Sequence, residues 1–84
     1  MTKTVTIRND LTELETIHEA ITGFLAEVGA SREFAEEMFL VAEEVLANTI
    51  SYGYVDDGDH EIKLTMMCED RNFTMRFADD AAPY

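Results

Sequence analysis

The chain has 84 residues, of which 18 are acidic and 6 are basic, and its formal net charge is -12 at pH 7. Because so short a chain buries only about 60 to 65% of its unfolded surface, we expect one thin hydrophobic core and a single domain over residues 1–84. The negative charge repels nucleic-acid phosphates and anionic lipid headgroups, which argues against nucleic acid and membranes as partners.

The first element predicted along the chain is a short strand. In residues 3–8, Val5 and Ile7 alternate with polar side chains, and this period of two is typical of a half-buried strand. We expect it at or near the edge of a sheet.

Two amphipathic helices are predicted next. Either Asn9 or Asp10 can cap the first helix, Gly29 ends it, and Ser31 caps the second, which runs to about Tyr52. The three-and-four spacing of the first helix is carried by Leu11, Leu14, Ile17, Ile21, Phe24, Leu25 and Val28. The broader apolar stripe of the second comprises Phe34, Ala35, Met38, Phe39, Val41, Ala42, Val45, Leu46, Thr49 and Ile50.

A loop and a hairpin complete the chain. Residues 52–61 contain glycines and acidic residues without periodicity, which predicts a loop. Residues 62–67 and 73–78 alternate apolar and polar side chains on either side of the turn-like sequence EDRN, which predicts a hairpin. The order of elements predicts an α+β fold, a two-layer sandwich with the helices packed on one face of a mostly antiparallel sheet.

The second predicted helix also carries polar residues suited to chemistry. Glu44 and Asn48 are four residues apart, so their Cβ atoms lie about 5 to 6 Å apart on one flank of a helix. A carboxylate can accept a proton from an attacking hydroxyl, and an Asn oxygen is a hard neutral ligand for magnesium. The pair fits metal-assisted phosphoryl transfer, but taken alone it is more typical of an ordinary solvated flank, because Glu is a good helix former.

Other polar clusters carry weaker signals. The spacing of His18, His60 and Cys68 is not that of zinc ligands, so we expect no zinc site. The acidic residues of the loop 52–61 lack the order of an EF-hand, which favours a solvated loop over a calcium site. The sequence has one cysteine, no apolar run near the roughly 18 residues of a membrane span, and no signal-like N-terminus. Together these features predict a soluble cytoplasmic protein.

Two segments resemble motifs of the GHKL ATPase superfamily. The run EVLAN from Glu44 to Asn48, followed by TISYGY, resembles the N-box in the form carried by anti-sigma-factor serine kinases. The run FADDAAPY from Phe77 to Tyr84 resembles the G1 box at the end of a strand. The order and spacing of the two motifs cover nearly the whole chain, and the resemblance implies an incomplete Bergerat-type ATP-binding fold.

The resemblance also implies roles for individual residues, with ATP and Mg²⁺ as cofactors. Glu44 would be the general base acting on a serine hydroxyl, and Asn48 would ligate the magnesium that bridges the ATP phosphates. Asp79 would accept a hydrogen bond from the adenine amino group, which favours adenine over guanine. Ala81 stands where the family has a glycine whose backbone comes close to the adenine. The methyl group of Ala81 therefore reduces the space between backbone and adenine.

The function implied by the resemblance is the ATP-binding module of an anti-sigma-factor serine kinase, whose partners are an antagonist protein and a sigma factor. The family's glycine-rich lid does not follow Tyr84, so we expect a domain cut short before the lid, and whether it acts as an enzyme stays open. The alternatives are a non-catalytic interaction module with the same fold and a fragment of a histidine-kinase ATPase domain. Apolar residues in excess of what so few elements can cover, and an open strand edge, predict a homo-oligomer.

Overall fold

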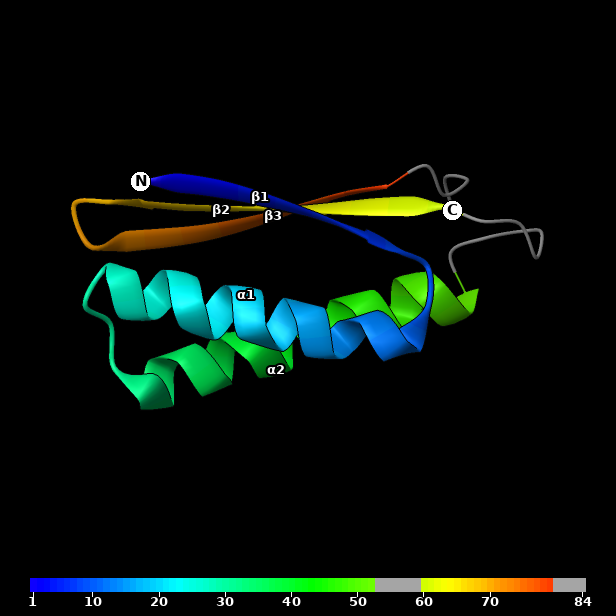
Figure 1. Ribbon diagram of the computed structural model, residues 1–84, viewed down its shortest axis with the longest axis horizontal. Coiled ribbons are helices and arrows are strands. Elements are labelled where there is room, and N and C mark those ends of the chain that lie inside the picture. The colour runs from blue at the N-terminus through cyan, green and yellow to red at the C-terminus, as the bar shows by residue number, and fades with distance from the viewer. Residues whose placement is uncertain (53–59, 80–84) are drawn as a thin grey trace.

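The computed structural model describes residues 1–52 and 60–79, and they form a two-layer α+β sandwich (Figure 1). In chain order the elements are β1 (Thr2–Arg8), a 3-10 turn (Leu11–Glu13), α1 (Leu14–Glu27), α2 (Arg32–Tyr52), β2 (Glu61–Glu69) and β3 (Asn72–Asp79). Both helices lie on one face of the sheet, as Figure 1 shows. The predicted fold class is confirmed; most of the loop predicted over 52–61 lies outside the described residues.

The described strands form one antiparallel sheet in the order β1-β2-β3. β1 pairs with β2 from Thr2 opposite Met67 to Arg8 opposite Glu61. β2 in turn pairs with β3 from Ile62 opposite Asp79 to Glu69 opposite Asn72, and so lies at the centre. Within the described sheet, β1 and β3 are therefore the two edges, and the prediction of an edge position for the first strand is confirmed.

A two-residue turn joins β2 to β3. Asp70 and Arg71 have φ angles of 51° and 68°, the left-handed values that a type I′ hairpin turn requires at both central positions. Glycine adopts this conformation freely, whereas a residue with a Cβ atom loses about 1 to 2 kcal/mol by it. Aspartate tolerates the left-handed region better than most residues, so Arg71 is the side chain that this turn geometry does not favour.

The core lies between the central strand and the two helices. Ile62, Leu64 and Met66 of β2 are almost fully buried, and the intervening residues of this strand are more exposed. The other core residues are Ile7 of β1, Ile17, Ile21, Phe24 and Leu25 of α1, and Ala35, Ala42 and Leu46 of α2. The apolar residues of β3 are only half buried, so this edge of the sheet is the less covered one.

The first predicted helix begins later than its periodicity suggests. Asp10, and not Asn9, provides the cap: its carboxylate accepts a hydrogen bond from the Thr12 backbone N–H at 3.0 Å. The Glu13 N–H donates to the Asp10 carbonyl at 2.9 Å, a three-residue spacing that makes this turn 3-10. Leu11 lies in that turn and is 49% exposed, so its place in the predicted apolar stripe was wrong.

The connection between the helices follows the prediction. Gly29 has a φ of 82°, the Ala30 N–H donates to the Leu25 carbonyl at 2.9 Å, and the Gly29 N–H donates to the Ala26 carbonyl at 3.1 Å. These two bonds form a Schellman motif, which requires a left-handed residue at this place. The Ser31 hydroxyl then accepts a hydrogen bond from the Phe34 N–H at 3.1 Å and caps α2.

The apolar stripe of α2 is broader than the face that the rest of the fold covers. Val41 is 48% exposed and Val45 is 38% exposed, although the pattern places both in the core stripe. Phe34 is also exposed, and Leu40, beyond the predicted stripe, is 61% exposed. Since α1 and the sheet cover only the side of α2 around Ala42, one apolar flank of this helix has no covering element among the described residues.

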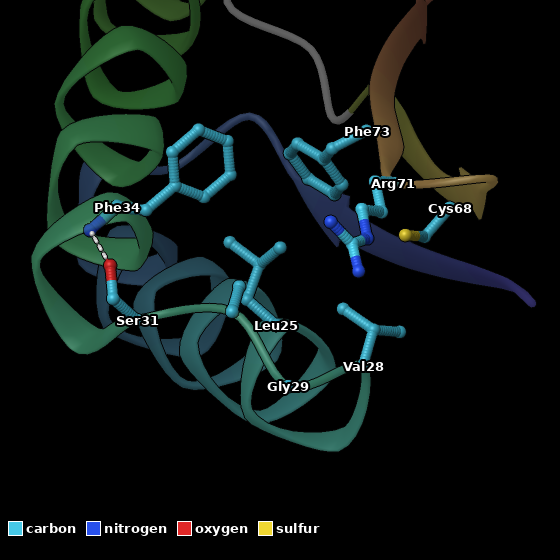
Figure 2. A pocket seen from close by; sticks show the side chains of 9 residues that line it. Leu25, Val28, Gly29, Ser31, Phe34, Cys68, Arg71 and Phe73 are labelled. Atoms are coloured by element: carbon cyan, nitrogen blue, oxygen red, sulfur yellow. Dashed lines mark hydrogen bonds between the residues drawn. The ribbon is translucent and has the colours of Figure 1, made fainter.

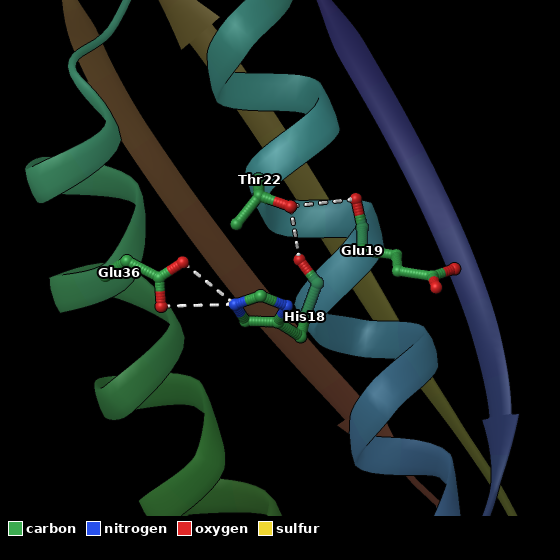
Figure 3. A network of polar contacts seen from close by, with 4 residues as sticks. All are labelled: His18, Glu19, Thr22 and Glu36. Atoms are coloured by element: carbon green, nitrogen blue, oxygen red, sulfur yellow. Dashed lines mark hydrogen bonds and ion pairs between the residues drawn. The ribbon is translucent and has the colours of Figure 1, made fainter.

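A polar contact links the two helices away from the sheet (Figure 3). His18 Nε2 of α1 lies 2.9 Å from one carboxylate oxygen of Glu36 of α2 and 3.1 Å from the other. The His18 ring also meets the edge of Phe39 with 4.6 Å between ring centroids. Because both partners of the pair are partly exposed, the pair contributes at most about 1 kcal/mol to stability.

Candidate functional site

The candidate site lies on the C-terminal half of α2. Glu44 and Asn48 are one helical turn apart, and both side chains are exposed. The neighbouring Ala42 and Leu46 are fully buried, so the flank that carries Glu44 and Asn48 faces away from the core. A carboxylate and a carboxamide can therefore address one ligand from this flank without displacing any core side chain.

Neither of these two side chains is engaged elsewhere in the described fold. Within residues 1–52 and 60–79, the Glu44 carboxylate and the Asn48 carboxamide have no hydrogen-bond or ion-pair partner. Their oxygens are thus available to a proton, a hydroxyl group or a metal ion. A general base or a metal ligand needs such an available oxygen, since a side chain bonded to a protein partner would first have to break that bond.

The surrounding charge restricts what can bind here. The sequence contains no lysine or arginine between Arg32 and Lys63, so this half of α2 has no cation of its own to offset phosphate charge. A polyphosphate is accommodated only together with a divalent cation. Magnesium fits this donor set, because it is bound in proteins by one or two side-chain oxygens together with phosphate oxygens and water.

The third predicted residue, Asp79, is the last residue of β3, and its Cα lies opposite that of Ile62 in the ladder. Figure 1 shows that the carboxyl end of β3 and the C-terminal end of α2 lie at the same end of the molecule. The fold thus brings the strand end that bears Asp79 to the end of the sandwich where Asn48 lies. Ala81 lies outside the described residues.

Metal sites built from the protein alone are not found in the described residues. In residues 1–52 and 60–79, no group of three or more His, Cys, Asp or Glu side chains could hold a metal ion. A magnesium ion at Asn48 would accordingly depend on oxygens of the nucleotide. In the same part of the chain, no helix is long and apolar enough to cross a membrane.

Sequence reasoning missed a cavity at the opposite end of the sandwich. It lies between the α1–α2 connection and the β2–β3 turn, and Arg71 is its one lining cation. The sequence pattern treats Arg71 only as a turn residue. A cation at a turn position that favours glycine, in so acidic a chain, is the only signal in the sequence that points to it.

Of three comparisons with known proteins, one identifies the family of the chain. A search of curated proteins and a search of solved structures found no match. A family model described as a histidine kinase-like ATPase domain matches residues 7–84, which is all of the chain except its first six residues. Domains of this family bind ATP, generally with Mg²⁺, and the exposed pair on α2 lies within the matched range. The chain belongs to the histidine kinase-like ATPase family.

Proposed function

We propose that this chain is the nucleotide-binding part of an anti-sigma-factor serine kinase. The observation that carries the proposal is the pair Glu44 and Asn48, exposed and without partners in the described fold, at the end of the sandwich where the strand bearing Asp79 also ends. The form of the motif, EVLAN followed by TISYGY, supports the serine-kinase specificity by its resemblance to the N-box of those kinases.

Each residue then has one task. The Asn48 carboxamide oxygen would hold magnesium, and the Glu44 carboxylate would accept the proton of the serine hydroxyl as that oxygen attacks. Bound MgATP would supply the γ-phosphoryl group to the serine oxygen, with ADP as the leaving group. Because Glu44 is exposed, the serine of a folded antagonist protein can reach it. The sigma factor would be the second protein partner, with the antagonist as the phosphorylated one.

The metal-ligand role of Asn48 is tested by calorimetric titration of the chain with ATP, with Mg²⁺ and with EDTA. We expect dissociation constants in the high-micromolar range or weaker, because α2 offers the phosphates no cation. Asn48→Ala should weaken binding only in the presence of Mg²⁺. Asn72→Ala, which removes an exposed Asn at the far end of the molecule, is the matched control and should change nothing. Equal loss with and without Mg²⁺, or no binding at millimolar MgATP, would contradict the proposal.

The base and the adenine contact have separate tests. Glu44→Gln should abolish phosphorylation of the antagonist serine while MgATP affinity stays within several-fold, because the base acts on the nucleophile. Glu43→Gln, the adjacent and half-buried carboxylate, is the control and should retain transfer.

Asp79→Asn should narrow the preference for ATP over GTP in competition binding, since a carboxamide can turn its amino group toward a purine carbonyl. An unchanged ratio of ATP to GTP affinity would show that Asp79 does not contact the adenine.

A second candidate function, self-association, is favoured by the uncovered flank of α2. Leu40, Val41 and Val45 are exposed there, and the described sheet has two open edges. We propose a second copy of the chain as the occupant, with association that strengthens as salt screens the net charge. Sedimentation over a concentration series should show a dimer that Val45→Glu dissociates and Leu11→Glu, an exposed control elsewhere, does not. A monomer at high concentration and high salt would exclude it.

A further inference from the structure

The cavity lined by Arg71 has the size and the walls of a site for a small molecule (Figure 2). Its volume is about 600 Å³, within the roughly 300 to 1,000 Å³ that is usual for pockets that hold small organic ligands. It lies where the α1–α2 connection faces the β2–β3 turn, and Figure 1 shows both connections at one end of the molecule. That end is opposite the C-terminal end of α2, so the cavity is separate from the candidate nucleotide site.

The walls of the cavity are largely apolar. Phe34 of α2 and Phe73 of β3 meet edge to face with 6.1 Å between their ring centroids. Leu25, which is 1% exposed, and the half-buried Val28 also line the cavity. Two aromatic rings and two branched aliphatic side chains favour an apolar body of similar size, since the burial of apolar surface is the main source of affinity in such pockets.

Arg71 adds a positive charge to these walls. Figure 2 shows its guanidinium reaching over the cavity between Phe73 and Val28. Within the described residues it has no hydrogen-bond or ion-pair partner, although the chain has 18 acidic residues. The five N–H donors of this guanidinium, arranged as a planar fork, match the two oxygens of a carboxylate.

The backbone at Arg71 gives an independent reason to assign it a ligand. With a φ of 68°, this residue occupies a turn position where glycine would fold with less strain. The arginine side chain therefore does not serve the turn. Arg71 thus combines a backbone conformation that is unfavourable for its residue type with a side chain that reaches over the cavity, a combination that is enriched at binding sites.

We propose that this cavity binds a small monocarboxylate with an aromatic or branched aliphatic body. The carboxylate pairs with the Arg71 guanidinium, and the body packs against Phe34, Phe73 and Leu25. A single cation against apolar walls matches one negative charge. A phosphate dianion or a nucleotide would leave further negative charge without a cationic partner beside the rings.

The test is an NMR titration of the ¹⁵N-labelled 84-residue chain with 3-phenylpropionate. We expect a dissociation constant in the high-micromolar to low-millimolar range, because so small a ligand has few atoms to bury. Shift changes should be confined to residues 25–34 and 68–73. The neutral analogue 3-phenylpropanamide should bind at least about tenfold more weakly, since it cannot form the charged pair.

Two variants separate binding from folding. Arg71→Gly relieves the turn, so it should melt at the same temperature as the parent chain or higher while losing at least about tenfold in affinity for 3-phenylpropionate. Arg76→Gln removes an exposed arginine of β3 that does not line the cavity, and it should bind like the parent chain. The proposal is overturned if the acid and the amide bind equally, if Arg71→Gly keeps its affinity, if the shifts map to the C-terminal half of α2, or if no binding is seen at millimolar ligand.

Discussion

We predict that replacing Gly23 and Gly29 by alanine will change stability in opposite directions. An added Cβ meets no atom within 4 Å at either position, so sterics with the rest of the fold do not distinguish the two sites. Gly23 lies inside α1, where alanine is favoured over glycine by about 0.5 to 1 kcal/mol. Gly29 has a φ of 82°, where a Cβ atom is unfavourable by about 1 to 2 kcal/mol. The free energies of unfolding of the two alanine variants should thus differ by about 1.5 to 3 kcal/mol.

Thermal unfolding followed by circular dichroism measures both changes. In a domain of this size, 1 kcal/mol corresponds to about 4 to 8 °C in Tm, so Gly23→Ala should raise Tm by about 2 to 8 °C and Gly29→Ala should lower it by about 4 to 16 °C. Gly29→Asn should lose less than Gly29→Ala, because asparagine tolerates the left-handed region better. Shifts of the same sign for both alanine variants would refute the reasoning that backbone conformation, and not packing, decides these positions.

Two further predictions address the core and the first cap. Leu46→Ala should lower the free energy of unfolding by about 2 to 5 kcal/mol in urea titrations, because Leu46 is fully buried. Leu40→Ala, on the exposed side of the same helix, should change it by no more than about 0.5 kcal/mol. Similar losses for the two variants would mean that α2 presents a different face to the core. The hydrogen bonds from the backbone and then the side chain of Thr12 lower the pKa of Asp10 from 3.8, so its stabilisation is present above the unfolded pKa and is lost as the pH falls through the folded pKa. Asp10→Ala should therefore lower Tm at about pH 7 and converge with the parent chain in strong acid; a constant difference would contradict the cap.

The elements of the fold could be predicted because their signals are local. Period-two alternation placed the strands, three-and-four spacing placed the helices, and Gly29 and Ser31 marked the helix junction through backbone geometry that few residues favour. The hairpin turn was found although Arg71 stands at the second central position, where such a turn prefers glycine. There the alternation of the flanking strands was the stronger signal.

What could not be predicted depends on neighbours distant in sequence. Periodicity shows which residues share a face of a helix, but not how much of that face other elements cover. For this reason Val41 and Val45, which belong to the predicted apolar stripe, are nevertheless exposed. In the same way, the spacing of His18 gives no hint that Glu36 of the other helix is its partner.

The candidate sites divide along the same line. The spacing of Glu44 and Asn48 puts them on one flank of a helix whatever the rest of the fold does. The position of Asp79 at the end of β3 follows from where the alternation stops. The cavity at Arg71, in contrast, exists only because the antiparallel register brings the hairpin turn to the helix junction, and no pattern within one segment encodes that meeting.

The pairing of β1 with β2 has a consequence for how the protein is made. The hydroxyls of Thr4 and Thr65 lie 3.2 Å apart although 61 positions separate them, and the Met1 amino group donates to the Cys68 carbonyl at 3.0 Å. Of the three described strands, β1 is thus synthesised first and waits longest for its partner. At about 5 to 20 residues per second, roughly 3 to 10 seconds pass between the synthesis of β1 and the start of β2. During that interval the backbone of β1 is an open template for other strands, and its alternating threonines, with Lys3 and Arg8 near its ends, limit how readily it pairs with them.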